Sequence, residues 1–340
     1  MNKLLSICIP SYNMESFLHR CVDSLLIPSL DKLEIIIVND GSKDRTLEIA
    51  RAYQQAHPES VVVVDKANGH YGSTVNAALK IATGKYFRIL DADDWFDTKA
   101  LEALVHKLDG CEADCVFTNF VVHDLSKEQV VSIRERLVTY EKVIPLRQNL
   151  IPINGFNMHQ LTYRLSFLKA IQYVQTEGVC YTDTEYIFYP LSQAETFVAF
   201  DLSLYQYFLG REEQSMSLSS LKKNISHRWP IVHRMLADKG YLHGNRMAAG
   251  LRSSMLQSLI GSIYEMYICY GDYASDYDAE LRAFLRRIKK EEPETYAKML
   301  TLNRHEVIFY VRFWLWFGRL SFPLCHLLFR LREGSGWNKA

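Results

Sequence analysis

The sequence has 340 residues, which is enough for one large domain or two of ordinary size. Hydrophobic residues make up 48% and charged residues 23%, a balance that excludes an intrinsically disordered chain. The 39 Lys and Arg residues match the 39 Asp and Glu residues in number, and this zero net charge argues against a general nucleic-acid-binding protein, which usually has a basic excess.

The seven cysteines show no framework of regular spacing, which is typical of reduced thiols in the cytoplasm. The amino-terminal apolar stretch ends at Pro10 and lacks the length and the small-residue cleavage site of a signal peptide. We therefore expect a cytoplasmic protein.

Short apolar strands alternate with helices along the first 120 residues. Strands are expected at 4–10, 33–38, 61–64, 86–90 and 114–119, and helices at 16–26, 44–55, 74–82 and 99–108. The run LEIIIV at 33–38 is apolar throughout, as in a strand buried on both faces. This pattern predicts an α/β domain with a mostly parallel central sheet flanked by helices.

Polar loops follow four of these strands, at the sheet edge where ligands bind in such folds. The loops lie at 10–13, 39–42, 65–69 and 91–94. Asp, Asn, Gly and Ser are also ordinary turn residues, so a single loop of this kind carries little weight. Three loops with Asp on the same edge favour a binding site.

The carboxylates of Asp91 and Asp93 lie on either side of Ala92 and can face one hard cation. Mg²⁺ and Mn²⁺ prefer oxygen ligands and keep positions open for substrate phosphates. The sequence contains neither GxxxxGK[ST] nor a GxGxxG after a strand, so this cation would have to neutralise any bound diphosphate. Asp94 is expected to cap the turn before Trp95.

The chain resembles the family 2 glycosyltransferases with the GT-A fold in three runs: SICIPSYNMESFLHRCVDSLL, EIIIVNDGSKDRT and GHYGSTVNAALKIATGKYFRILDADDWFD. The resemblance extends over about residues 4–215 in the order, spacing and strand context of its motifs. It implies transfer of a sugar from a nucleotide-sugar, most often a UDP-sugar, with inversion at the anomeric carbon.

The resemblance also implies roles for single residues in binding the nucleotide-sugar. Asp40 would accept a hydrogen bond from the uracil ring N–H, which suits an acceptor-only carboxylate. Gly72 and Asn76 would hold the loop and the start of the next helix near the donor. The nucleoside pocket would be lined by Pro10, Ser11, Tyr12 and Asn13, and the segment near the ribose and the metal ion would be Asp91, Ala92 and Asp93.

The catalytic base of the family corresponds to Asp183, although Thr182 replaces the usual Glu before it. Asp183 could instead cap the helix that follows, and a contribution from Glu185 is left open. Arg211 follows a Tyr-x-Tyr pattern and would clamp the diphosphate, the alternative being a solvated loop arginine.

Two histidines lie near the expected site. His70 belongs to the Gly-rich loop, and His159 precedes a helix expected at 163–174. A lone histidine is more often structural than functional, so neither receives a role in the reaction.

Beyond residue 217 the pattern is helical, so we expect a catalytic domain at 1–217 and a helical region at 218–340. Within the latter, residues 304–332 are predicted to form an apolar helix kinked at Pro323, with His305, Arg312, Arg319 and His326 on one stripe. No apolar stretch reaches the ~18 residues of a spanning helix. We therefore expect an interfacial helix on an anionic membrane, the alternatives being packing on the core or one side of a homodimer.

Together these features predict a metal-dependent inverting glycosyltransferase, cytoplasmic and peripheral at the inner face of the cell membrane. Its cofactor would be Mn²⁺ or Mg²⁺, its donor a nucleotide-sugar and its acceptor a saccharide, lipid-linked in the case of membrane contact, in surface polysaccharide synthesis. A sugar nucleotidyltransferase would release pyrophosphate rather than a nucleoside diphosphate. A non-catalytic sugar-nucleotide-binding scaffold protein is the third alternative.

Overall fold

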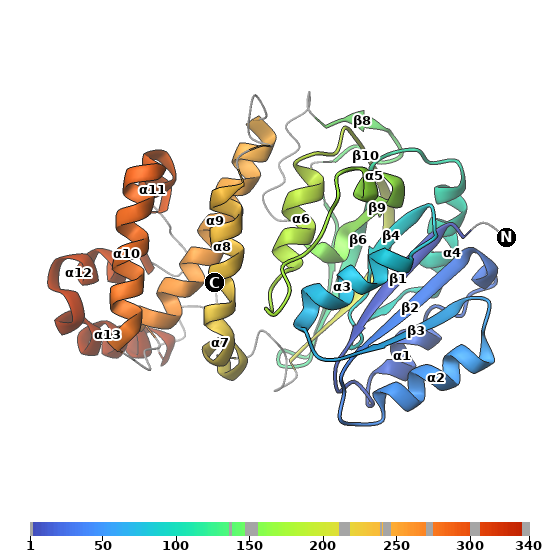
Figure 1. Ribbon diagram of the computed structural model, residues 1–340, viewed down its shortest axis with the longest axis horizontal. Helices are drawn as coiled ribbons and strands as arrows, with labels where there is room; N and C mark the ends of the chain where they lie inside the picture. Colours follow the sequence, from blue (N-terminus) through green and yellow to red (C-terminus); the bar gives the residue numbers. More distant parts are fainter. Residues whose placement is uncertain are drawn as a thin grey trace. The chain divides into compact units, whose positions relative to one another are not determined.

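The computed structural model describes residues 3–135, 138–146, 156–210, 218–238, 240, 246–269, 275–299 and 307–334. The chain divides into two compact units, Met1–Gln214 with Gly240–Ala248, and Ser215–Lys239 with Ala249–Ala340. The first is a mixed α/β unit and the second is helical (Figure 1).

A curled sheet forms the centre of the first unit, with the strand order β3-β2-β1-β4-β9-β6-β10-β5. β7 pairs with β6, and β8 pairs with β10. The strands are β1 (Leu5–Ser11), β2 (Leu33–Asp40), β3 (Val61–Lys66), β4 (Tyr86–Ile89), β5 (Trp95–Phe96), β6 (Cys115–Asp124), β7 (Gln129–Ile133), β8 (Ile144–Pro145), β9 (Leu161–Arg164) and β10 (Thr196–Leu209).

The expected parallel arrangement is found in β1 to β4 and between β6 and β10. β9 is antiparallel to both of its neighbours, β4 and β6. Residues 163–164 were expected to lie at the start of a helix, but Tyr163 pairs with Phe87 and Cys115 in the sheet. The helix is therefore limited to α5 (Leu165–Ala170), because the buried sheet positions take up the aromatic and β-branched residues before it.

Helices cover the sheet on both faces. Besides α5 they are α1 (Leu18–Asp23), α2 (Thr46–Ala56), α3 (His70–Ile81), α4 (Thr98–Asp109) and α6 (Asp183–Leu191). α2 and α4 follow the expected spans closely, α1 is shorter than the expected 16–26, and α3 begins four residues before the expected start at 74. The predicted Gly-rich loop is therefore mostly the first turns of a helix.

Alternate residues of the central strands point to opposite faces of the sheet. Leu5, Ile7 and Ile9 of β1 are buried in one cluster with residues of α1, α2 and α4. Cys8 and Ile36 are equally buried but lie outside that cluster, on the side where α3 packs on β1 and β2. Burial on both faces explains why β2 is apolar without alternation until its end.

The order of the strands determines where the polar loops meet. The chain runs outward from β1 through β2 to β3 and then returns to β4 on the other side of β1. The carboxyl ends of β1 and β4 therefore flank a topological switch point, where ligands bind in open α/β sheets. The loops at 10–13 and 91–94 begin at this point.

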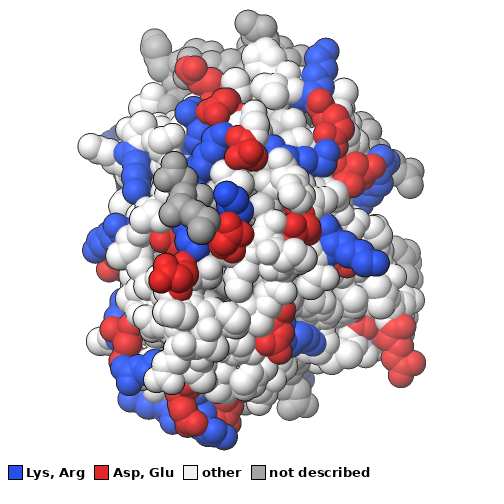
Figure 2. Space-filling model, turned by 90° about the vertical axis from the view of Figure 1, so that its right-hand side faces the viewer, with Lys and Arg blue, Asp and Glu red and all other residues white. Residues whose placement is uncertain are grey.

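The surface of the molecule mixes charges of both signs. Lys and Arg side chains lie beside Asp and Glu side chains over the face shown in Figure 2. Exposed pairs such as Arg45–Glu48 and Lys85–Glu112 are separated by 2.7 Å. Such pairs are typical of a solvated surface and contribute little to stability.

The second unit contains helices only, among its described residues. They are α7 (Leu218–Asn224), α8 (Arg228–Ala237), most of α9 (Arg246–Tyr264), α10 (Ser275–Glu291), α11 (Pro293–Met299), α12 (Val307–Phe317) and α13 (Phe322–Gly334). The buried guanidinium of Arg252 on α9 binds the carboxylate of Glu292 at 2.7 Å through both nitrogen–oxygen pairs. This ion pair links α9 to the segment between α10 and α11.

The predicted single helix at 304–332 is wrong in its continuity. α12 ends at Phe317, a 3₁₀ turn covers Gly318–Ser321, and α13 begins at Phe322. Gly318 has a φ of +59°, the left-handed conformation that ends helices. Because of this break, Arg312 lies in α12 and His326 lies in α13. The predicted stripe that places both residues along one helix therefore does not exist. Within the described ranges, no helix has the length and hydropathy needed to cross a membrane.

Candidate active site

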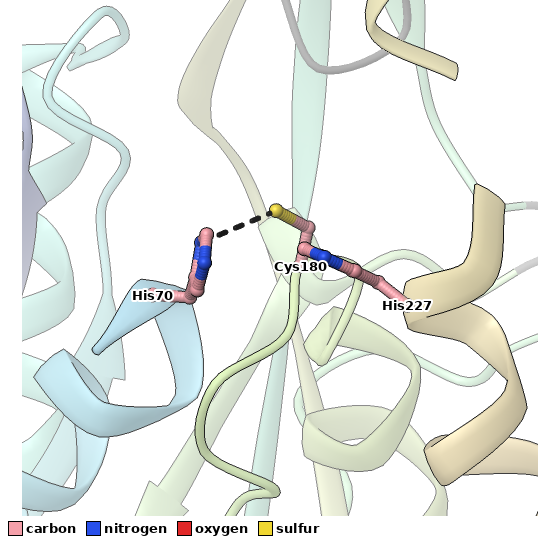
Figure 3. A group of neighbouring side chains, drawn as sticks. All are labelled: His70, Cys180 and His227. Carbon is pink, nitrogen blue, oxygen red and sulfur yellow. Dashed lines mark hydrogen bonds between the residues drawn. The ribbon is translucent and has the colours of Figure 1, made fainter. Parts of the chain in front are cut away.

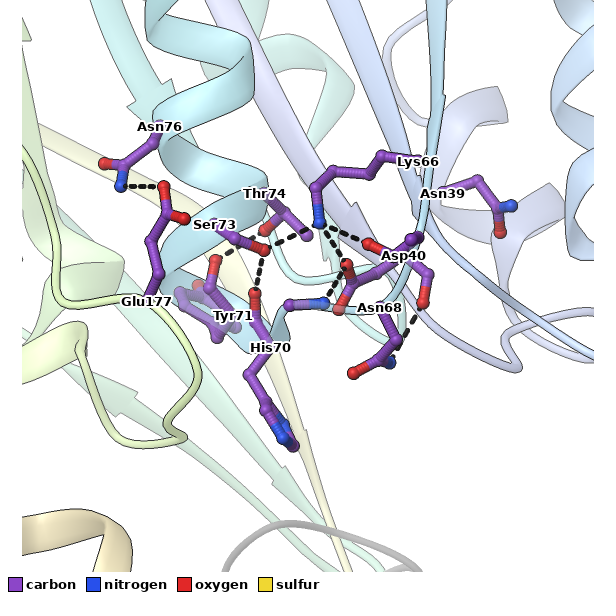
Figure 4. A network of polar contacts seen from close by, with 12 residues as sticks. Asn39, Asp40, Lys66, Asn68, His70, Tyr71, Ser73, Thr74, Asn76 and Glu177 are labelled. Carbon is purple, nitrogen blue, oxygen red and sulfur yellow. Dashed lines mark hydrogen bonds and ion pairs between the residues drawn. The ribbon is translucent and has the colours of Figure 1, made fainter.

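Asp40 lies at the carboxyl end of β2, is only 3% exposed, and is bound to the loop that follows β3 (Figure 4). Its Oδ1 accepts hydrogen bonds from Lys66 Nζ at 2.7 Å and from the Gly69 N–H at 2.9 Å. Asn68 Nδ2 donates to its carbonyl oxygen at 2.9 Å. Among the described residues, every hydrogen bond to this carboxylate reaches Oδ1, so Oδ2 is available to a ligand N–H.

The loop after β1 packs on the loop after β2. Asn13 has a φ of +54°, which Asn tolerates better than most residues. Its N–H donates to Ser42 Oγ at 3.0 Å, and its side-chain oxygen accepts from the Lys43 N–H at 2.8 Å. Ser11 is buried, Pro10 is half-buried, and the ring of Tyr12 is exposed beyond them.

Tyr205 of β10 fixes the loop after β4. Its hydroxyl donates to Asp94 Oδ2 at 2.7 Å and accepts from the Asp91 N–H at 3.1 Å. The Phe208 N–H donates to Asp94 Oδ1 at 2.7 Å. Asp94 therefore joins the loop to β10, a structural role different from the expected cap of the turn. Ala92 is buried between Asp91 and Asp93, which are both half-buried. Burial raises the pKa of Asp94, and the nearby charges of Asp93 and Asp91 raise it further.

Arg20 holds the same loop from the side of α1, and sequence analysis missed it. Its Nη2 donates to the Asp93 carbonyl at 2.6 Å. Its guanidinium lies 4.0 Å from the ring centre of Trp95 and 4.4 Å from that of Phe208. Stacking between two rings fixes the guanidinium plane, so Arg20 positions the Asp93 backbone. Its exposed place on a short helix offers no sequence signal.

The His159 ring is stacked on Tyr207 at a centroid distance of 4.3 Å and packs tilted against Tyr205 at 4.6 Å. Burial lowers the pKa of His159 to about 3, with a further contribution from Arg88, so the ring is neutral. Its Nδ1 is buried and has no hydrogen-bond partner among the described residues. One ligand atom each of Asp91, Asp94 and His159 lie within 4.8 Å of one another. Asp93, predicted as a metal ligand with Asp91, is not in this group.

Arg88 is a second residue that sequence analysis missed. It is fully buried in β4, donates to Thr162 Oγ1 at 2.7 Å, and also donates to the His159 carbonyl. Burial lowers the pKa of Arg88 to about 10, so it remains a cation. A charged residue inside the apolar strand YFRIL was the available signal, because a buried arginine needs several acceptors.

Asp183 is the first residue of α6, at the helix end that favours a carboxylate. The capping position is Thr182, whose side chain makes no capping hydrogen bond, so the alternative of Asp183 as the cap residue is wrong. Tyr71 donates to Asp91 Oδ1 at 2.7 Å. Burial raises the pKa of Tyr71, and the charges of Asp91 and Asp183 act in the same direction. Tyr71 therefore lies close to both carboxylates, which are 92 positions apart in the chain.

Buried hydrogen bonds hold the segment that leads to Asp183. Glu185 is fully buried and accepts from both the N–H and the Oγ1 of Thr176 at 2.7 Å. Asn76 of α3 donates to the Gln175 carbonyl at 2.9 Å and to Glu177 Oε1 at 2.8 Å (Figure 4). The contribution of Glu185, left open by the sequence, is a structural one: both oxygens of its carboxylate accept hydrogen bonds from Thr176.

Gly72 allows α3 to approach the same segment. A Cβ atom at this position would lie 2.1 Å from the Thr176 carbonyl oxygen. Gly72 and Asn76 were predicted to bind the donor, and the contacts that the structure gives them are to residues 175–177. They position the segment before Asp183.

His70 begins α3 with a φ of +62°, and its Nδ1 lies 3.7 Å from Cys180 Sγ (Figure 3). Both residues belong to the first unit. This contact brings the start of α3 next to the segment before Asp183. The remaining predicted residue, Arg211, lies outside the described residues.

A family model described as glycosyl transferase family 2 matches residues 6–171. The chain is 38% identical over 120 residues to the uncharacterized glycosyltransferase EpsJ of Bacillus subtilis, which is 35% of either chain. It is 40% identical over 116 residues to the chondroitin synthase of Pasteurella multocida, 34% of this chain and 12% of that one. The chain thus spans about a third or less of the length of these curated relatives.

Two solved structures resemble the whole chain in fold. Staphylococcus aureus TarS 1-349 in complex with UDP-GlcNAc matches with a TM-score of 0.61 and 18% identity, over 91% of each chain. The mannosyltransferase PcManGT from Pyrobaculum calidifontis, in complex with GDP-Man and Mn²⁺, matches with a TM-score of 0.52 and 16% identity, over 94% of this chain and 89% of that one. The fold is therefore the GT-A fold predicted from the sequence.

Proposed function

We propose that the chain, whose residues 6–171 match a family model described as glycosyl transferase family 2, transfers a sugar from a nucleotide-sugar to a hydroxyl of a saccharide acceptor. The similarity to a chondroitin synthase supports a role in polysaccharide assembly. The structural similarity to a UDP-GlcNAc complex supports a UDP-sugar as donor. We assign the reaction to a catalytic domain at residues 1–217.

The proposal rests on one observation above all. Asp91, after β4, accepts a hydrogen bond from the Tyr71 hydroxyl at 2.7 Å, and the charge of Asp183, at the start of α6, adds to the effects of burial and Asp91 that raise the pKa of that hydroxyl. A carboxylate beside the diphosphate and a carboxylate beside the acceptor are the two groups that the transfer requires. Their shared neighbour supports one site at the switch point of the sheet.

The nucleotide would bind along the ends of β1 and β2. The Oδ2 atom of Asp40 suits the uracil ring N–H, and the exposed ring of Tyr12 suits the face of the base. Pro10, Ser11 and Asn13 would complete this pocket.

The acidic loop fits a divalent cation. Its oxygen donors are those that Mn²⁺ and Mg²⁺ prefer, and burial, together with the nearby charges of Asp93 and Asp91, raises the pKa of Asp94. Asp91 and Asp93 would hold the ion. When bound, the ion would neutralise charge on the departing nucleoside diphosphate.

Asp183 would act as the general base. It would take the proton from an acceptor hydroxyl while that oxygen attacks the anomeric carbon from the face opposite the diphosphate. The bond from the anomeric carbon to the phosphate oxygen then breaks, and the configuration inverts without a covalent enzyme intermediate. Glu185, Asn76 and Gly72 would keep Asp183 in line with the donor.

Turnover of a panel of nucleotide-sugars with Mn²⁺ and with Mg²⁺ tests the proposal. The wild type should release nucleoside diphosphate, whereas a nucleotidyltransferase would release pyrophosphate. Asp183→Asn should bind the donor normally and turn over about 10²- to 10⁴-fold more slowly. Asp201→Asn makes the same change at a surface carboxylate paired with Arg134 and should leave the rate unchanged. Equal rates for Asp183→Asn and the wild type would disprove the assignment of the base.

A further inference from the structure

The last two helices of the second unit expose a continuous set of large apolar side chains. Their exposed fractions range from 37% for Leu328 to 89% for Leu320. We call this set the apolar face, and it consists of Trp316, Phe317, Leu320, Leu324, Leu327, Leu328 and Leu331. A contiguous apolar surface on a folded protein usually marks a binding surface.

The apolar face is not the side of α13 that packs on the protein. Phe322, Cys325 and Phe329 of the same helix are buried on the other side. The exposed leucines at 324, 327, 328 and 331 follow the spacing of one helical face. A helix that needed only to pack on its own unit would carry polar residues there, so this second apolar side requires a further partner.

The orientation of α12 is fixed by its neighbour α10. Trp314 is fully buried, and its Nε1 donates to Asp278 Oδ1 at 2.7 Å. The guanidinium of Arg282 lies 4.6 Å from the centre of the same ring. With Trp314 held inward, Trp316 and Phe317 are directed outward, 83% and 52% exposed. The apolar face therefore belongs to an anchored element.

The charged residues of the segment that carries the apolar face are almost all positive. Residues 307–334 contain four arginines and one glutamate, a net charge of +3, and no carboxylate occurs before Glu333. Arg312 and Arg330 are exposed. A twofold contact with a second copy would place these arginines near one another without carboxylates to pair with, so a second copy fits poorly. An anionic surface fits well.

We propose that the apolar face binds the surface of an anionic lipid bilayer, with α13 lying in the plane of the interface. α13 has 13 residues, so its length of about 20 Å is too short for a hydrocarbon core of about 30 Å. The leucines would enter the boundary of the acyl chains, and the arginines would meet lipid phosphates. This docking goes beyond the transfer reaction. Only its corollary, a lipid-linked saccharide acceptor reached at the same surface, rests on the proposed function.

Flotation of the full chain with vesicles tests the docking. The wild type should float with vesicles of phosphatidylcholine and phosphatidylglycerol, float less with phosphatidylcholine alone, and dissociate as salt rises. The double substitution Leu327→Glu and Leu331→Glu should lower the bound fraction at least about tenfold. The matched control is Leu125→Glu with Val130→Glu in the first unit, where the exposed fractions are 55% and 68%, against 54% and 63% at Leu327 and Leu331. The control should float like the wild type.

A second pair, Leu327→Gln with Leu331→Gln, removes apolar surface without adding charge and should also lose binding while its circular dichroism stays native. Three results would overturn the docking: a wild type that stays in the aqueous fraction with anionic vesicles, leucine variants that float as well as the control, or a lipid-free dimer that the leucine variants convert to monomer. Nucleotide-sugar hydrolysis without vesicles should be unchanged in the leucine variants, so failure of the catalytic proposal would appear separately.

Discussion

Replacing Gly72 by alanine gives the sharpest test of how the site is positioned. In a helix interior this change normally stabilises by up to about 1 kcal/mol, because alanine is the better helix former. Here the new Cβ would lie 2.1 Å from the carbonyl oxygen of Thr176. A backbone oxygen cannot rotate away, and its segment is held in place by a hydrogen bond from Asn76 to the Gln175 carbonyl and by one from the Thr176 N–H to the Glu185 carboxylate.

The overpacking therefore exceeds the gain in helix propensity. Forcing a methyl group into a packed contact costs about 1–3 kcal/mol, and displacement of the segment would weaken bonds worth about 1 kcal/mol each. We expect Gly72→Ala to lower the free energy of unfolding by about 1–3 kcal/mol. Turnover should fall as well, because Asp183 follows the displaced segment.

Urea denaturation followed by far-UV circular dichroism measures the change. The control is Gly110→Ala in the same unit, at the end of α4, where an added Cβ meets nothing within 4 Å and φ is −90°. This control should be neutral or more stable by about 0.4–1 kcal/mol. A Gly72→Ala protein as stable as Gly110→Ala would refute the close approach of α3 to Thr176.

Three further predictions concern other contacts of the first unit. Glu185→Gln replaces an oxygen that accepts a Thr176 hydrogen bond with an amide group that donates. It should lower the free energy of unfolding, measured by urea denaturation, by about 1–3 kcal/mol, and it should lower kcat more than it raises the KM for the donor. An unchanged kcat would contradict a positioning role for Glu185. Tyr71→Phe removes the hydrogen bond to Asp91, so the Mn²⁺ concentration for half-maximal turnover should rise about fivefold, and an unchanged titration would exclude that bond from metal binding. Burial alone would raise the pKa of Asp114, but the hydrogen bonds from Arg164 and from two backbone N–H groups outweigh it and lower this pKa. The stabilisation is thus complete above the unfolded pKa of about 3.9 and is lost as the pH falls through the lower folded value. Asp114→Asn should therefore have a lower Tm than the wild type at pH 7, and this difference in Tm should close below about pH 4. A difference in Tm that did not depend on pH would contradict this role of Asp114.

The local spacing of apolar residues was sufficient to predict those elements in which it matches the buried positions. The run LEIIIV could only be a strand covered on both faces, and the polar residues after each strand were bound to share an edge once the strands ran parallel. The position of Asp183 at a helix start was likewise predictable. The helix expected at 163–174 is present only as α5, and its start was wrong because Tyr163 has partners in two strands remote in sequence.

The sequence by itself determined the alternating fold and the edge that carries the acidic loops, because the periodicity of apolar residues reports which faces of each element are buried. Of the two candidate carboxylates, Asp91 was indicated by its position after a strand, and the role of Asp183 was implied by the family resemblance. Only the tertiary structure decided that Tyr71 joins Asp91 to the neighbourhood of Asp183, that Glu185 binds Thr176, and that the last apolar segment breaks at Gly318. These features depend on which distant residues meet, and a hydrogen bond between them leaves no periodic trace along the chain.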